Sequence, residues 1–291
     1  MTPGSRGTSF ARVLVAAAVA PLLGLAPVAA QHGWTADMVT TDTLAKRAPW
    51  GPGEHLVYGV KLGWFNVGTG HLTIEGFDIV RGNATYRAVM GMDGGALGFS
   101  INDRYTTWFD VYSLQSWRFV RDYGGTYTST RHYEFYPEQD LWDREDNDEF
   151  GPMLTDNPLD DISFLYFLRT LPLRVGDTYT FNDYFKEEGN PVVVRVIRKD
   201  RRKTDAGEFN TIVVKPTFRS EGLFSENGNA ELHFSDDERR LLVYMWVNMP
   251  RLPGGVSLHL NSVQEGFPVH PESRAEVLQA RQRRGGRVSN R

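Results

Sequence analysis

The sequence has no cysteine among its 291 residues. This absence excludes disulfide bonds, thiolate metal ligands, a cysteine nucleophile and the lipid-modified N-terminal cysteine of bacterial lipoproteins. Stability must then come from a hydrophobic core, which a chain of this length with 41% hydrophobic residues can build.

Long hydrophobic runs are also scarce, and the one that is present lies near the N-terminus. Residues 13–25 are apolar, follow the basic residues Arg6 and Arg12, and lead to small residues that end at Ala30. Because the run is shorter than the roughly 20 residues of a membrane-spanning helix, the pattern predicts a secretory signal peptide cleaved between Ala30 and Gln31. We therefore expect a periplasmic protein with no integral membrane span in its mature chain.

Negative charge outnumbers positive charge in the body of the chain, residues 31–270. The formal net charge is −4, although residues 271–291 hold six arginines against two glutamates. Nucleic-acid phosphates are bound by clustered lysine and arginine, so we expect no nucleic-acid partner. The basic end has no periodic apolar positions and is predicted to be a disordered tail.

Composition divides the sequence into four parts. We predict the signal peptide over 1–30, a polar linker over 31–50, a single β-rich domain over 51–270 and the basic tail over 271–291. The domain is expected to begin at the cluster of proline and glycine in residues 49–53, because such clusters mark loops between structured segments.

Short runs rich in Val, Ile, Thr, Tyr, Phe and Trp dominate the domain, with Gly, Asn, Asp and Pro between them. This composition is typical of β-strands joined by turns. The pair Asn227-Gly228 is typical of a tight hairpin turn, since both residues tolerate positive φ angles. The expected strands are 54–63, 67–79, 84–92, 103–109, 114–121, 126–136, 177–185, 191–201, 208–218, 229–235, 240–248 and 256–265.

One helix is predicted over 157–168, with Asn157 as its N-cap and Pro158 as its first residue. It should end before Pro172, and its apolar residues form a stripe along one side: Ile162, Leu165, Tyr166 and Leu168. We predict a mainly β fold. Its highly curved antiparallel sheet, a spiral or open barrel of roughly a dozen strands, is wrapped around or closed by this amphipathic helix.

Catalytic signatures are lacking. The segment closest to a nucleophile elbow, 254–258, lacks the closing glycine, and no S-x-x-K tetrad occurs. The glycine-rich segment 94–98 has no lysine and does not suit a phosphate. The seven histidines occur singly, without the paired spacing of metal ligands: 32, 55, 71, 132, 233, 259 and 270. We predict no catalytic residue, no metal ligand and no cofactor, and the residues that bind a ligand stay unknown.

Two acidic segments are interpreted as structural. The run 143–151 does not make a calcium loop, because Phe150 and Asn157 fall where carboxylate ligands are needed. The adjacent acids Asp236 and Asp237 are predicted to form a turn in which their side chains bond the backbone.

Several segments in this order resemble the bacterial family called domain of unknown function 3108. They are Pro52-Gly53-Glu54-x-Leu56-x-Tyr58, Gly68-x-Gly70, Tyr166-Phe167-Leu168-Arg169, Pro172-Leu173, Gly176-Asp177 and Ser235-Asp236-Asp237 with Arg240. The resemblance implies an exported envelope protein with a highly curved sheet wrapped around a helix, and it brings no catalytic residues.

Two functions remain open. The first is a non-catalytic periplasmic protein that maintains the cell envelope by binding a lipid or other apolar ligand, or another envelope protein. Aromatic segments such as Trp64-Phe65 could line its binding surface, although such residues are more often core. The alternative is a periplasmic hydrolase whose carboxylate and histidine site is assembled in space.

Overall fold

A computed structural model describes residues 48–96, 99–219, 230–248 and 255–267. The expected signal peptide with its Ala30–Gln31 cleavage site, the basic tail and the Asn227-Gly228 turn lie outside the described residues. All described residues belong to one compact unit, 32–291.

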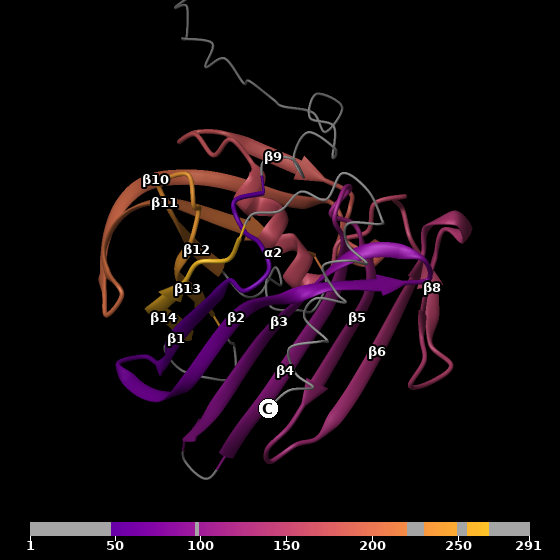
Figure 1. Ribbon diagram of the computed structural model, residues 1–291, viewed down its shortest axis with the longest axis horizontal. Helices are drawn as coiled ribbons and strands as arrows, with labels where there is room; N and C mark the ends of the chain where they lie inside the picture. The colour runs from indigo at the N-terminus through magenta and orange to yellow at the C-terminus, as the bar shows by residue number, and fades with distance from the viewer. Residues whose placement is uncertain (1–47, 97–98, 220–229, 249–254, 268–291) are drawn as a thin grey trace, which may run out of the picture. The chain divides into compact units, whose positions relative to one another are not determined.

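In the described ranges, fourteen strands form one antiparallel sheet, as the prediction of a mainly β fold required (Figure 1). Twelve of them correspond to the predicted strands, and two short ones, β7 and β8, were missed. The bounds are β1 His55–Leu62, β2 Phe65–Val80, β3 Asn83–Ala96, β4 Phe99–Asp110, β5 Ser116–Tyr123, β6 Ser129–Tyr136, β7 Leu141–Arg144, β8 Phe150–Pro152, β9 Thr178–Phe181, β10 Val192–Thr204, β11 Gly207–Thr217, β12 Ala230–Ser235, β13 Leu242–Val247 and β14 Val256–Gln264.

The strand order places the first and last strands at the centre of the sheet. β1 pairs with both β2 and β14, while β8 and β9 form the two edges. The chain therefore winds outward from β1 to β8, crosses to the other edge, and winds back from β9 to β14. The sheet is not closed by strand pairing, so it is an open barrel.

The helix α2 (Asp161–Thr170) makes this crossing, but it begins later than predicted. Its N-cap is Asp160 and not Asn157, because the Asp160 carboxylate accepts hydrogen bonds from the backbone N–H groups of Ile162 and Ser163. The Ser163 hydroxyl accepts from the Asp160 N–H in return, which completes a capping box. The helix ends before Pro172, as predicted.

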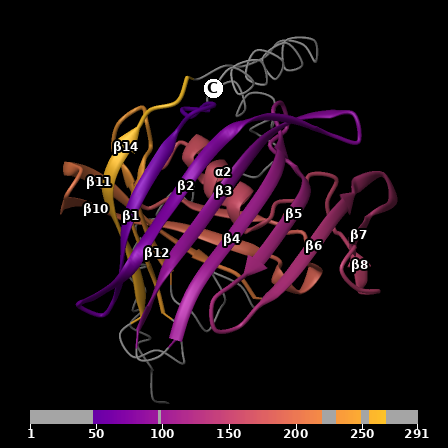
Figure 2. The ribbon, with the colours of Figure 1, turned by 60° about the horizontal axis from the view of Figure 1, so that its bottom comes forward.

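The helix was predicted to bury one apolar side, but the structure buries all of its sides. All ten residues of the helix are buried, and the helix lies on the concave side of the sheet, beside β3 and β4 (Figure 2). A helix that is enclosed on every side packs all its faces against other elements. It therefore fills the interior of the open barrel, and the polar residues at its two ends must find partners there.

The gap between the two sheet edges is bridged by loops. The Leu159 N–H donates to the Asp183 carbonyl at 2.6 Å, and the Phe185 N–H donates to the Leu159 carbonyl at 3.1 Å. The Phe185 ring packs against aromatic rings of β6 and β7: Tyr133, Phe135 and Trp142. Side-chain packing and irregular backbone bonds thus complete what strand pairing leaves open.

Candidate functional site

A buried ion pair holds the C-terminal end of α2. The Arg169 guanidinium donates to both carboxylate oxygens of Glu54, at 2.6 and 2.8 Å, and also to the Arg239 carbonyl at 3.1 Å. Both partners are fully enclosed. Three of the segments that carry the family resemblance therefore meet here: the one with Glu54, the one with Arg169 and the turn that follows Asp237.

A second buried network holds the N-terminal end of α2. The Arg121 guanidinium donates to Asp161 at 2.6 Å, and the Tyr184 hydroxyl donates to the same carboxylate at 3.1 Å. Acids at the start of a helix and a cation near its end both complement the helix dipole. These charged groups fix the position of the helix inside the sheet.

Among the buried carboxyl groups that the structure describes, Asp160 has the clearest shift in pKa. Burial raises its pKa to about 6, while hydrogen bonds from Thr107, Ser116 and two backbone N–H groups oppose that shift. A raised carboxyl pKa is a usual sign of general acid catalysis. Here the group is fully enclosed and serves as the helix cap, and its hydrogen-bond donors are hydroxyl and backbone N–H groups. Its chemistry is that of a structural cap.

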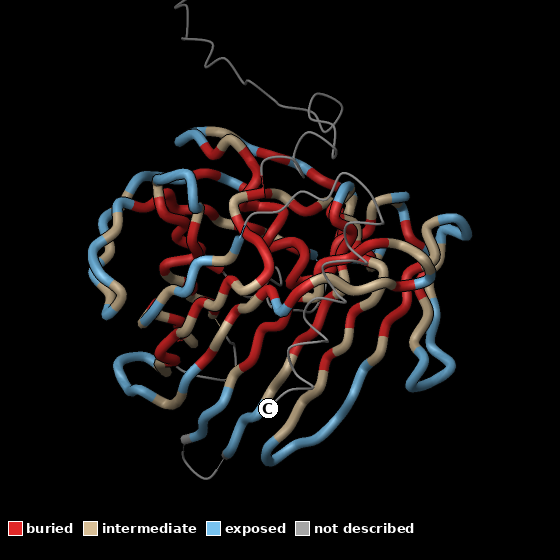
Figure 3. The backbone as a smooth tube through the Cα atoms, viewed as in Figure 1, coloured by how far each residue is buried: buried red, intermediate tan, exposed pale blue. Residues whose placement is uncertain are grey.

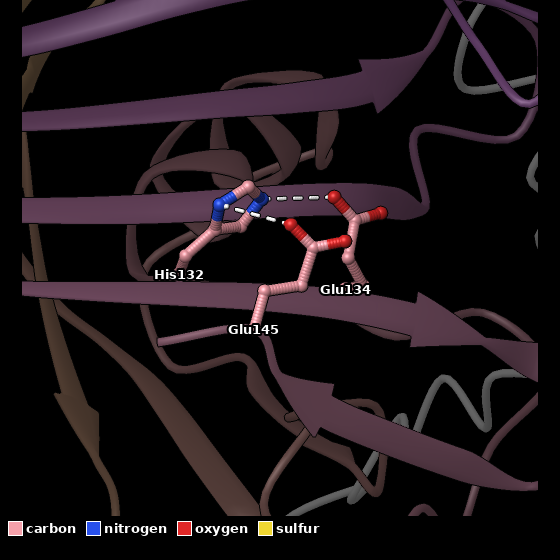
Figure 4. A group of neighbouring side chains, drawn as sticks. All are labelled: His132, Glu134 and Glu145. Atoms are coloured by element: carbon pink, nitrogen blue, oxygen red, sulfur yellow. Dashed lines mark hydrogen bonds and ion pairs between the residues drawn. The ribbon is translucent and has the colours of Figure 1, made fainter. Parts of the chain in front are cut away.

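A partly exposed titratable group lies on β6 and just after β7 (Figure 4). His132 faces Glu134 through Nε2 at 2.9 Å and Glu145 through Nδ1 at 3.3 Å. Among the described residues, these three are the only set whose ligand atoms lie close enough to share a metal ion. The group was not predicted from the sequence, because Glu145 comes to His132 only through the β6–β7 hairpin. The H-x-E spacing on one strand face was the available signal.

The neighbours of this group do not favour a metal. Arg81 and Arg118 both donate to the Glu134 carboxylate. Burial alone would raise the pKa of Glu134, but these two arginines and His132 lower it below its usual value. A divalent cation would have to displace or lie beside two guanidinium groups, which repel it. The group is better described as an ion-pair network that joins the β2–β3 turn to β5, β6 and β7.

The acidic run and the acidic turn are also occupied by structural contacts. In the run, Arg144 pairs with both Asp146 and Glu149, so these carboxylates already have a cationic partner. In the turn, Asp237 accepts hydrogen bonds from the Ser235 hydroxyl at 2.6 Å and the Arg239 N–H at 3.1 Å. The predicted turn is confirmed for Asp237, whereas the Asp236 carboxylate pairs with the side chains of Lys199 and Arg240.

Exposed apolar side chains gather where three hairpins end. We define the apolar rim as Trp64 and Phe65 at the β1–β2 turn, Ile101 near the start of β4, and Tyr127 in the β5–β6 turn. Their exposed fractions are 87%, 67%, 45% and 73%. The interpretation of Trp64-Phe65 as core is therefore wrong. Figure 3 shows that the strands are buried around α2 and become exposed toward these ends.

Glycines bring strands together above the apolar rim. At Gly68 on β2, a Cβ atom would lie 2.1 Å from the Asp93 carbonyl oxygen of β3. A distance that short is far inside van der Waals contact, so only glycine fits. This close approach keeps the first two hairpins side by side, and it gives a physical reason for one of the glycines that carry the resemblance.

No helix among the described residues is both long enough and apolar enough to cross a bilayer. The curated proteins include none that matches this chain. Among solved structures, the chain is similar to a β-barrel-like protein of domain of unknown function DUF1849 from Brucella abortus. Identity is 9% and the TM-score 0.47, over 75% of this chain and 99% of that one. It is also similar to a candidate lipoprotein from Parabacteroides distasonis. Identity is 11% and the TM-score 0.33, over 75% and 98% of the two chains.

The family model described as "Protein of unknown function (DUF3108)" matches residues 57–260. That match spans β1 to β14 and includes α2, so it covers nearly all of the described sheet. The resemblance expected from the short segments is thereby confirmed, and the chain belongs to the DUF3108 family.

Proposed function

We propose that this protein is exported to the periplasm and maintains the cell envelope by binding an apolar ligand or an envelope protein, without catalysis. The observation that carries the proposal is the apolar rim. Trp64, Phe65, Ile101 and Tyr127 expose apolar side chains near one end of the sheet, where one partner can contact all of them. The signal-peptide pattern with cleavage between Ala30 and Gln31 supports export.

The filled interior of the sheet also supports the proposal. The helix and the aromatic side chains around it occupy the concave side of the sheet: Trp50, Phe109, Tyr166, Phe185 and Phe218 are all buried. A partner is therefore expected to meet the outside of the domain. The titratable groups near α2 serve its capping and pairing, so they do not favour the hydrolase alternative.

The proposal can be tested in the bacterium that makes the protein. Deleting the gene should raise the entry of a large antibiotic that an intact envelope excludes, and the wild-type gene should restore the barrier. A variant with Trp64→Ser, Phe65→Ser and Tyr127→Ser should fold but fail to restore it, while a Glu145→Gln control should restore it fully. Restoration by the rim variant, or a deletion without effect on the envelope, would refute the proposal.

Export has its own measurement. The mature protein should be recovered from the periplasmic fraction with Gln31 as its first residue, which mass spectrometry of the intact chain can establish. A chain that keeps its first thirty residues in the cytoplasmic fraction would contradict the export that the proposal requires.

A further inference from the structure

We propose that the apolar rim rests on the surface of a phospholipid bilayer and inserts its side chains among the lipid headgroups. This inference rests on the proposed function and specifies its partner. Four features of the described residues carry it: the alignment of the hairpin ends, the residue types, the separation of the side chains and the local charge.

The strand register places the rim residues near one end of the sheet. Gly68 of β2 pairs with Gly94 of β3, Gly94 pairs with Ile101, and Ile101 bridges Gly125. Phe65 and Tyr127 follow this row by three and two residues, and Figure 1 shows the β1–β2 and β5–β6 turns at the same end of the sheet. A flat surface can therefore touch these two turns and the start of β4 at once.

The residue types suit the boundary between water and lipid. Trp64 and Tyr127 have amphipathic rings, which are enriched at the headgroup level of membranes. Phe65 and Ile101 add apolar surface. Because Trp64 and Tyr127 lie in turns, Phe65 and Ile101 lie near strand ends, and all four are exposed, they can enter a bilayer by the depth of a side chain while the backbone stays in water.

Their separation favours lipid over a folded protein. Trp64 and Phe65 lie at β1 and β2, while Tyr127 lies beyond β5, so the spacing of about 4.8 Å between neighbouring strands puts them roughly 15 Å or more apart. A stable protein interface needs about 800 Å² of complementary surface on each partner. Separate projecting side chains do not provide such a surface, whereas a bilayer accepts each one independently.

Charge near the hairpin ends is balanced. Lys61, Arg104 and Arg131 are cations of β1, β4 and β6 that lie within four residues of the rim residues in sequence. Three aspartates offset them, each of which accepts a hydrogen bond: Asp93 from Asn102, Asp103 from Gly124 and Asp122 from Thr130. Binding to anionic lipid requires an excess of lysine and arginine, so this rim is expected to bind neutral lipid and to depend little on salt.

The experiment is flotation of the full mature chain with phosphatidylcholine vesicles, without detergent. Wild-type protein should float with the vesicles at both low and high salt. The triple variant with Trp64→Ser, Phe65→Ser and Tyr127→Ser should partition more weakly by about tenfold or more, since each inserted side chain contributes through its buried apolar area. A matched control, Phe150→Ser with Leu154→Ser, removes exposed apolar side chains near β8 and should float like wild type.

A second readout identifies the inserted residue. Vesicles with brominated acyl chains should quench part of the tryptophan fluorescence of the wild-type protein, and Trp64→Phe should lose that quenched component while still floating. Wild type that does not float, or a control variant that loses flotation equally, overturns the inference. If the rim variant fails to restore the envelope barrier but wild type does not float, the partner is an envelope protein or a single apolar ligand and not a bilayer surface. The proposed function then stands and the lipid inference falls.

Discussion

Charged side chains are usually exposed and apolar side chains usually buried. The interior around α2 and the apolar rim are exceptions to the first and the second of these tendencies. Inside, charged residues are buried, yet each has a close partner: Glu54 with Arg169, and Asp161 with Arg121. At the rim, apolar residues are exposed and the fold gives them no cover. Buried charges need partners for the chain to fold, whereas exposed aromatics add little to folding. Folding therefore does not explain the apolar composition of the rim.

The largest expected effect comes from breaking the interior pair. Glu54→Gln leaves the Arg169 guanidinium buried without a charge partner, and should lower the free energy of unfolding by about 3–5 kcal/mol. Urea unfolding near neutral pH measures the change. Glu208→Gln, which breaks an exposed pair with Arg201, serves as the control and should cost less than about 1 kcal/mol. Equal costs for the two variants would contradict the structural role of the buried pair.

Asp160 should make stability depend on pH in an unusual direction. Its pKa rises from 3.8 to about 6 in the folded protein because the carboxyl is buried. The folded state therefore binds a proton that the unfolded state has released, and the contribution of Asp160 to stability is present below pH of about 4 and lost as the pH rises through about 6. We expect a loss on the order of 2–3 kcal/mol across that window.

The comparison variant is Asp160→Asn, which keeps an oxygen for the helix cap but does not titrate. The difference in unfolding free energy between wild type and Asp160→Asn should change between pH 4 and 6 by that amount. A difference that is flat with pH would show that the carboxyl keeps its ordinary acidity in the folded protein.

In the His132 group, only substitution of the buried residue Glu134 should clearly lower the free energy of unfolding. Glu134→Gln removes the partner of two arginines and should cost about 1–3 kcal/mol. Glu145→Gln changes a side chain that is about half exposed and should stay within about 0.5 kcal/mol. Unfolding midpoints of both variants decide this, and a larger effect at Glu145 would assign a binding role to that carboxylate.

Zinc should leave the thermal unfolding midpoint of the wild-type protein unchanged, and so should a chelator, because Arg81 and Arg118 already neutralise Glu134. A specific site would instead stabilise the folded state by mass action. A saturable rise in the midpoint that Glu145→Gln abolishes would reverse our interpretation of this group.

Substitutions at the rim should also have little effect on stability. Trp64→Ser with Phe65→Ser should change the free energy of unfolding by no more than about 0.5 kcal/mol, because neither side chain is packed. A large loss would mean that these residues support the hairpin, and would weaken their use as evidence for binding.

Much of the sheet could be predicted because its strands carry long runs of β-branched and aromatic residues. The strands β7 and β8 could not, since they are four and three residues long and lie in a segment rich in charge. The helix was predicted, but its first residue was not, because Asn157 and Asp160 can both cap a helix. Contacts from Thr107 and Ser116 on other strands select Asp160.

The amino-acid sequence by itself determined the class of fold, the number of main strands, the presence of one helix and the family. These depend on local composition and on the order of short segments. Only the tertiary structure decided that α2 is buried on every side, that Glu54 meets Arg169, and that Trp64 and Phe65 face water. These outcomes depend on which strands lie beside each other, and local composition cannot distinguish an aromatic residue in the core from one at a hairpin end.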